Sequence, residues 1–290
     1  MRTVIQTENL TKTYGKARGI TGVNLSVGSG EIYGFMGPNG AGKSTTIRSL
    51  LGLIQPTAGN AYIFGKECAK EKTRILEKVG YMPSETVFYK GMKVKEVIAL
   101  SAKLRRKDCR IQAAELCERL RLDVEKKVEQ LSLGNRKKVA IVCAMQHEPG
   151  LYIFDEPTSG LDPLIQKEFF DLILERNKQG ATFFLSSHVL SEVKKYCTRA
   201  AIIREGKVIA EDSVENLIQS NARKVTVSGI KVLPQELQES AKEVKKYGDQ
   251  IHFLYQGETG RLLRILQTQP LTDILIEEPE MEEIFLHYYQ

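Results

Sequence analysis

The sequence lacks any hydrophobic run long enough to cross a membrane. One of the longest apolar runs in the 290-residue chain is Val139-Ala-Ile-Val-Cys-Ala-Met145, which ends at Gln146. A bilayer-spanning helix needs roughly 18–20 such residues. The first residues, Met-Arg-Thr-Val-Ile-Gln-Thr-Glu, also lack the apolar core of a signal peptide. These absences predict a cytoplasmic chain that acts at a membrane only through a partner.

Metal-binding and redox patterns are missing as well. The cysteines form no C-x-x-C pair and show no spacing typical of metal ligands. They are Cys68, Cys109, Cys117, Cys143 and Cys197. An odd number of cysteines in a chain without a signal sequence favours reduced, mostly structural thiols. We therefore expect no zinc or iron site.

No concentrated basic stripe is present. The chain has a formal net charge of +6; residues 221–290 hold 8 Lys/Arg and 11 Asp/Glu, so this part is −3 and the remainder is +9. Nucleic-acid-binding proteins usually concentrate their basic residues. The densest cluster, Lys103-Leu-Arg-Arg-Lys107, is typical of a solvated helix face. We expect no nucleic-acid partner.

The sequence does contain a phosphate-binding loop. Residues 37–45 match G-x-x-x-x-G-K-[ST], between an apolar stretch and a helical segment. The N–H groups of such a loop bind anions, helped by the positive end of the next helix. Lys43 is expected to reach the β- and γ-phosphates, and the Ser44 hydroxyl to bind Mg²⁺. The predicted loop residues are Gly37, Pro38, Asn39, Gly40, Ala41, Gly42, Lys43, Ser44 and Thr45.

This loop alone does not identify the reaction, because GTPases, nucleotide kinases, helicases and transport ATPases share it. A second motif, Leu151-Tyr-Ile-Phe-Asp155-Glu156, narrows the choice. A buried parallel strand that ends beside the loop places Asp155 where Mg²⁺ binds. Glu156 can then orient or deprotonate an attacking water. Without the phosphate loop, the same residues would indicate only the end of a strand.

Two further polar residues are candidates for phosphate contacts. Ser132 lies in Leu131-Ser-Leu-Gly-Asn135, just before a helix-forming segment. It is either a second anion site or an ordinary N-cap. His188 follows the predicted strand 181–186. A lone histidine is usually structural, but one at the end of a core strand can face the ligand crevice.

The order of elements predicts an α/β fold. Apolar and polar positions alternate in short runs over residues 1–36, which predicts β-strands that lead into the phosphate loop. From Lys93 to about Met145 the apolar residues have helical spacing. Apolar strands then alternate with helices, which indicates a parallel core sheet. We predict an ATPase domain at 1–220, with a helical subdomain at about 86–148, and a small α+β domain at 221–290.

In this order, the motifs resemble the nucleotide-binding subunit of an ABC transporter over residues 4–215. The matches are Gly37–Thr45 with Walker A, Leu131–Asn135 with the LSGGQ signature, Leu151–Glu156 with Walker B, Ser159-Gly-Leu-Asp162 with the D-loop and His188 with the switch histidine. Tyr14 matches the aromatic residue that stacks on adenine. The resemblance implies a P-loop NTPase core with a parallel sheet, an antiparallel N-terminal β part and a helical insertion.

The resemblance also implies a mechanism. Two such domains, identical or homologous, would bind head to tail around two ATP molecules with Mg²⁺. Ser132 and Gly134 would close on the γ-phosphate held by Lys43 of the partner subunit. Glu156 would act as base, and His188 would contact the γ-phosphate. Hydrolysis would power an integral membrane permease, which would hold the chain at the inner face of the cell membrane.

The chain departs from the family pattern at two motifs. The signature has Leu133 and Asn135 where the family usually has Gly and Gln. At the position of the Q-loop glutamine it has Ser84, whose side chain is too short to reach Mg²⁺. The neighbouring Glu85 is therefore the candidate metal ligand in this segment, beside Ser44 and Asp155.

Residues 276–285 resemble the tail of bacterial single-domain ATPases that serve drug, antimicrobial-peptide or ion exporters. We therefore expect an exporter subunit. Two alternatives stay open: a sensory ABC module that signals through ATP-driven dimerisation, and a soluble ABC ATPase that acts on ribosomes or DNA. Relatives of the second kind carry tandem ATPase domains or long coiled coils, and the sequence shows neither a repeat nor sustained heptads.

Overall fold

The chain folds into two compact units. The computed structural model describes residues 2–15, 17–218 and 222–277. Contacts between residues divide the chain into Met1–Glu211 and Asp212–Gln290. The division predicted from the sequence, after residue 220, lies slightly later in the chain. Among the described residues, no helix is both long enough and apolar enough to span a bilayer.

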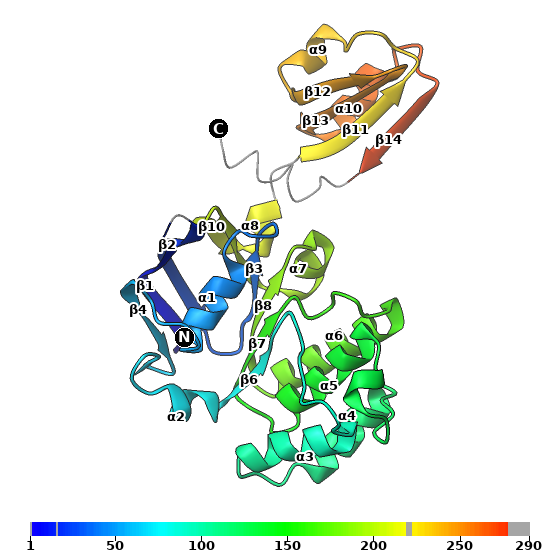
Figure 1. Cartoon of the computed structure of the whole chain (residues 1–290). Coiled ribbons are helices and arrows are strands. Elements are labelled where there is room, and N and C mark those ends of the chain that lie inside the picture. The colour runs from blue at the N-terminus through cyan, green and yellow to red at the C-terminus, as the bar shows by residue number, and fades with distance from the viewer. Residues whose placement is uncertain (1, 16, 219–221, 278–290) are drawn as a thin grey trace. The chain divides into compact units, whose positions relative to one another are not determined.

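A six-stranded sheet forms the centre of the first unit (Figure 1), in the order β10-β9-β3-β8-β7-β6. Its strands are β3 (Ile32–Met36), β6 (Val79–Met82), β7 (Leu151–Asp155), β8 (Thr182–Ser187), β9 (Arg199–Arg204) and β10 (Lys207–Ser213). The five strands from β9 to β6 in this order pair in parallel. The predicted parallel core is therefore confirmed.

Both faces of this sheet are buried, because successive side chains of a strand point to opposite faces. In β7, Tyr152 and Phe154 pack into one apolar cluster with the helical region. Leu151 and Ile153 pack into a second cluster with the N-terminal strands. The helices associated with the sheet include α1 (Lys43–Leu50), α2 (Lys72–Leu76), α6 (Pro163–Lys178) and α7 (Leu190–Tyr196). Packing on both faces fixes the positions of the strand ends, which carry the polar residues Asp155 and Ser186.

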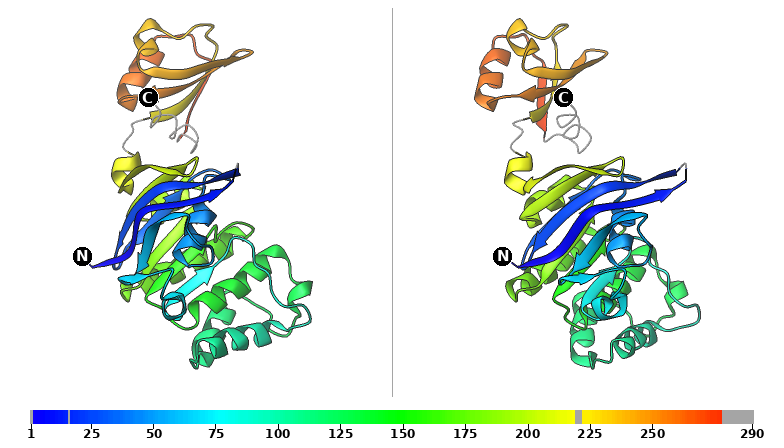
Figure 2. Two further views of the ribbon diagram at one scale, coloured as in Figure 1. Left: turned by 60° about the vertical axis from the view of Figure 1, so that its left-hand side comes forward. Right: turned by 90° about the vertical axis from the view of Figure 1, so that its left-hand side faces the viewer.

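An antiparallel sheet forms the N-terminal part of the same unit, as the sequence predicted. Its order is β2-β1-β4-β5, and Figure 2 shows its long strands in blue. The strands are β1 (Thr3–Tyr14), β2 (Ala17–Gly28), β4 (Ala58–Ile63) and β5 (Lys66–Glu67). Helix α1 contacts β2 and β4 on one side and β7 on the other. Helix α1 is therefore packed against strands of both sheets.

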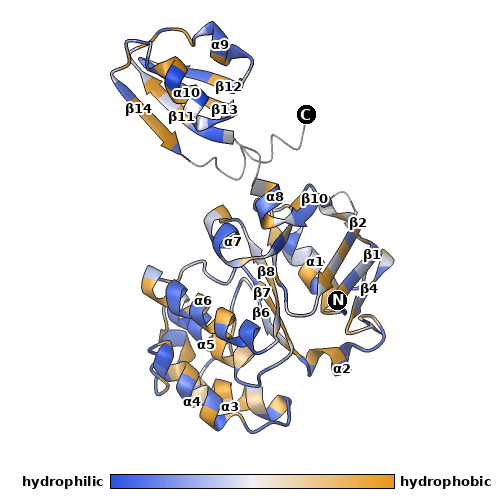
Figure 3. Cartoon of the chain, turned by 180° about the vertical axis from the view of Figure 1, so that it is seen from behind, coloured by the Kyte–Doolittle hydropathy of each residue, from blue (hydrophilic) through white to orange (hydrophobic). Residues whose placement is uncertain are grey.

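The predicted helical region contains α3 (Val94–Leu104), α4 (Arg110–Arg119), the 3-10 helix η1 (Val128–Gln130) and α5 (Leu133–Met145). Helices α3 and α4 both contact α5, and Figure 3 shows their mixture of hydrophobic and hydrophilic residues. The five cysteines are all free. Burial raises the pKa of the Cys117 thiol to about 11 and that of Cys143 to about 12. Both thiols are protonated at neutral pH, as expected of structural cysteines.

The second unit contains an antiparallel sheet with the order β12-β13-β11-β14. Its elements are α8 (Val214–Ile218), β11 (Ala222–Ser228), α9 (Gln235–Gln238), β12 (Ala241–Tyr247), β13 (Gln250–Gln256), α10 (Thr259–Leu266) and β14 (Asp273–Glu277). Its core includes Val225, Phe253 and Leu262. Most of the segment 276–285 that resembles the tail of exporter ATPases, from residue 278 on, lies outside the described residues.

Candidate nucleotide-binding site

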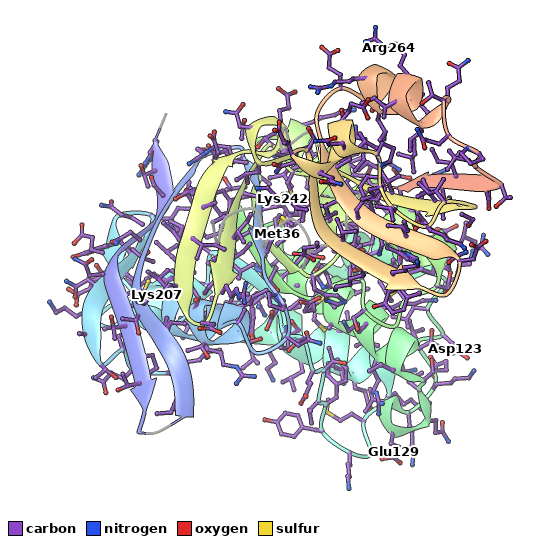
Figure 4. The ribbon with its side chains drawn as sticks, turned by 90° about the horizontal axis from the view of Figure 1, so that it is seen from above. Met36, Asp123, Glu129, Lys207, Lys242 and Arg264 are labelled. Carbon is purple, nitrogen blue, oxygen red and sulfur yellow. The ribbon has the colours of Figure 1, made fainter. Side chains whose placement is uncertain are left out.

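The phosphate loop connects the end of β3 to the start of α1, as the sequence predicted. Figure 4 labels Met36, the last residue of β3, from which the loop continues. Positions 37 and 42 of the loop both require glycine. A Cβ atom on Gly37 would lie 2.4 Å from the Ile203 backbone oxygen, and Gly42 has φ +113°. Gly42 is the N-cap of α1 and no side chain caps it. The N–H groups of the first turn are therefore available to an anion.

Lys43 is buried at the first position of α1. Its Nζ donates hydrogen bonds to the backbone oxygens of Gly37, at 2.5 Å, and Pro38, at 3.2 Å. The same Nζ lies 3.0 Å from Glu156 Oε1. The loop thus folds around its own lysine and holds the ammonium beside the carboxylate of Glu156, the residue that follows β7.

Asp155 is the last residue of β7 and is only 1% exposed. It pairs in parallel register with Ser186 of β8, whose Oγ donates a hydrogen bond to Asp155 Oδ1 at 2.6 Å. β8 lies between β7 and β3. The carboxyl ends of parallel strands meet at one edge, which is the usual ligand crevice of an α/β sheet. This topology brings Asp155 and the phosphate loop to the same edge.

Glu156 has an unusual backbone conformation and two charged or polar neighbours. Its φ is +50°, a left-handed conformation that costs a non-glycine residue about 1–3 kcal/mol. Its N–H donates to the Ser186 backbone oxygen at 3.3 Å and to Ser186 Oγ at 3.0 Å. Its Oε2 lies 2.6 Å from His188 Nδ1. The Glu156 carboxylate therefore bridges the Lys43 ammonium and the His188 ring.

Ser132 is exposed and is the N-cap of α5, where its Oγ accepts a hydrogen bond from the Asn135 N–H at 3.3 Å. The N-cap alternative is thus observed. An added Cβ on Gly134 would lie 2.7 Å from the Gly160 backbone oxygen, so the signature segment packs closely on the D-loop. Leu133 is exposed and lies beside Gly160 of the D-loop. Among the described residues, no hydrogen bond or ion pair joins Ser132 to the phosphate loop of its own chain.

Tyr14 is the last residue of β1 and is half-exposed, with Lys12 Nζ 5.2 Å from the centre of its ring. An exposed ring at a strand end is free to stack on a base, and this role stays a prediction. The structure gives Tyr14 no contact with Lys43 or Glu156 within the part of the chain that it describes.

Ser84 and Glu85 follow β6, which pairs with β7. The end of β6 lies close to Asp155: burial and the Asp155 carboxylate raise the pKa of Tyr81 to about 12, against the opposing charge of Arg48. Glu85 itself is exposed. Within residues 2–15, 17–218 and 222–277, no group of three or more His, Cys, Asp and Glu residues could hold a metal ion by itself. The role of Glu85 as a metal ligand stays a prediction.

Two residues of this edge were missed in the sequence. Ser186 holds both Asp155 and the Glu156 backbone, and its only sequence signal is a small polar residue at the end of an apolar strand. Lys137 of α5 is buried, and its Nζ donates to the Glu156 backbone oxygen at 2.5 Å. It lies between Arg136 and Lys138, a pattern that usually indicates a solvated surface.

Comparisons with known proteins find similar sequences and similar folds. The ABC transporter family model matches residues 20–159. The chain is 40% identical over 227 residues to the bacitracin transport ATP-binding protein BcrA of Bacillus licheniformis, covering 77% of this chain and 74% of that protein. It resembles the structure of an ATP-binding subunit of an ABC transporter, with a TM-score of 0.70, 31% identity and coverage of 74% of this chain and 92% of the other. A dimeric ATP-binding cassette in a post-hydrolysis state with ADP and Pi gives a TM-score of 0.65 at 25% identity, with coverage of 72% and 98%.

Proposed function

This chain belongs to the ABC transporter family as an ATP-binding subunit and ATPase, and we propose that it powers a separate membrane permease that exports a drug or an antimicrobial peptide. In this proposal two copies, or one copy and a homologous subunit, close around two Mg-ATP molecules. The export of a peptide or drug is supported by the similarity to a bacitracin transport protein. The permease would hold the chain at the inner face of the cell membrane.

The observation that carries the proposal is the cluster of Lys43, Glu156 and His188 beside the phosphate loop. In ATP hydrolysis, Lys43 would neutralise the β- and γ-phosphates, since its ammonium already lies among the loop carbonyls. The Glu156 carboxylate would orient the attacking water and accept its proton. The His188 ring, whose Nδ1 lies 2.6 Å from that carboxylate, would also contact the γ-phosphate.

The residues present fit a magnesium ion. Asp155 offers a buried carboxylate and Ser44 a hydroxyl at the start of α1, and hard oxygen ligands of this kind suit Mg²⁺, which usually takes one or two carboxylates plus phosphate oxygens and water. When bound, the ion would neutralise charge on the phosphate oxygens. Ser186 would keep the Asp155 carboxylate oriented through its 2.6 Å hydrogen bond.

Closure of two chains should depend on Ser132. We expect Ser132→Arg to bind ATP with an affinity within about twofold of wild type, because Ser132 has no contact with Lys43 in its own chain. Hydrolysis should fall at least about tenfold, since the long arginine side chain would fill the space at the N-terminus of α5 that the phosphate of the partner subunit has to approach. Steady-state hydrolysis and sedimentation with Mg-ATP measure the two effects. A Ser132→Arg protein that hydrolyses ATP normally would eliminate the two-chain site.

Association with a permease should depend on exposed apolar residues after β6. Val87 and Tyr89 are 87% and 74% exposed, and both lie within five residues of Ser84, which stands at the Q-loop position. The tagged chain, purified from native membranes in detergent, should carry an integral membrane protein with it. A Val87→Ser, Tyr89→Ser double variant should recover at least fivefold less of that protein and still bind ATP. Recovery of no membrane protein by the wild type would favour the sensory or soluble alternatives.

A further inference from the structure

Lys137 is a buried lysine whose ammonium contacts the backbone of a proposed active-site residue. It is 1% exposed, although lysine is among the residue types that are rarely buried without a partner. Its Nζ donates a hydrogen bond to the Glu156 backbone oxygen at 2.5 Å. Because an unpaired buried charge is strongly unfavourable, the contacts of this ammonium explain why the position tolerates lysine.

Three carboxylates interact electrostatically with the Lys137 ammonium. Burial lowers its pKa, and the negative charges of Glu156, Asp155 and Glu192 oppose that shift. Glu156 and Asp155 lie at the end of β7, whereas Glu192 lies in α7. The lysine therefore stands where α5 meets the edge of the sheet that carries the phosphate site.

The backbone of Glu156 is held from both sides. Its N–H donates to Ser186, and its carbonyl oxygen accepts from Lys137. With φ at +50°, this peptide persists only if its surroundings determine its conformation. The direction of the side chain follows from the backbone, and the carboxylate accordingly points to Lys43 at 3.0 Å and His188 at 2.6 Å.

We propose that Lys137 is a positioning residue for hydrolysis: it fixes the Glu156 peptide and so aims the Glu156 carboxylate at the attacking water. The inference rests on the proposed role of Glu156 as base. Ser132, proposed to contact phosphate in trans, caps the same helix. Through Lys137, α5 thus links the signature segment to the base of its own chain.

Three variants test this role. Lys137→Met keeps an unbranched side chain of similar volume and removes the donor. Its kcat should fall about 10- to 100-fold, since small displacements of a catalytic group have effects of that size, and its KM for ATP should stay within about twofold of wild type. Lys137→Gln retains an N–H donor on a shorter side chain and should have an intermediate kcat. The control is Lys138→Met, a change at the adjacent buried lysine, which should keep the wild-type kcat.

The outcome separates this inference from the proposed function. An unchanged kcat in Lys137→Met, with Glu156→Gln inactive, would overturn the role of Lys137 alone. A loss of ATP affinity equal to the loss of kcat, or the same loss in Lys138→Met, would show a structural role and overturn it too. A Glu156→Gln protein with wild-type turnover would instead overturn the proposed base. Thermal unfolding of each variant confirms that folded protein is compared.

Discussion

Glu156→Gln is expected to bind ATP and to hydrolyse it at least about 100-fold more slowly than wild type. An amide cannot accept a proton from water, and general-base catalysis typically contributes 10²–10⁴-fold. The substitution keeps the shape of the side chain and leaves Lys43, 3.0 Å from the carboxylate, free to bind phosphate. Because ATP would persist at the site, the variant should sediment as a dimer in Mg-ATP. Single-turnover hydrolysis and sedimentation velocity give the two readings.

A matched control is Glu175→Gln. Glu175 lies in α6, and its carboxylate pairs with Arg119 at 2.5 Å. Among the described residues, no hydrogen bond or ion pair joins Glu175 to the phosphate loop. This variant should hydrolyse ATP at the wild-type rate and should not trap a dimer. Turnover of Glu156→Gln at the rate of the control would show that Glu156 is not the base. Another carboxylate at this edge, such as Asp155, would then need testing.

The motifs that the sequence predicted best are contiguous. The phosphate loop and the end of β7 each consist of a buried strand followed at once by polar residues, so local pattern alone places them. Their proximity follows from topology, because β3 and β7 both pair with β8. The P-loop fold and the ABC family were therefore predictable from the sequence and are confirmed.

The supporting residues were not predictable, because their roles depend on register and packing between distant elements. Ser186 contacts Asp155 only because the parallel register of β7 and β8 aligns them. Lys137 is flanked by Arg136 and Lys138, so its burial depends on how α5 packs against the sheet. The sequence shows only a small polar residue at a strand end for Ser186, and it carries no local signal for the burial of Lys137.

The second unit illustrates the same limit. Strand β12 has no recognisable strand pattern in the sequence, because most of its side chains are exposed and it carries charged residues without an apolar alternation. Among the strands that the structure describes, it lies at the edge of its sheet and pairs with β13. Charged residues on an edge strand oppose unwanted pairing with other chains, and they also remove the pattern by which a strand is recognised.

Lys43→Ala is expected to reduce ATP affinity at least about 100-fold, which corresponds to about 3 kcal/mol. The ammonium is the group that neutralises the β- and γ-phosphates, and charge-assisted hydrogen bonds in a buried site are strong. The substitution also removes the cation beside Glu156, so two negative groups would face each other when the nucleotide enters.

Lys43→Met preserves the packed stem and should show nearly the same loss. Lys72→Ala, at the exposed first residue of α2, controls for loss of a helix-initiating lysine and should bind ATP normally. Equilibrium binding of a fluorescent ATP analogue compares the three, and wild-type affinity in Lys43→Met would exclude the phosphate loop as the nucleotide site.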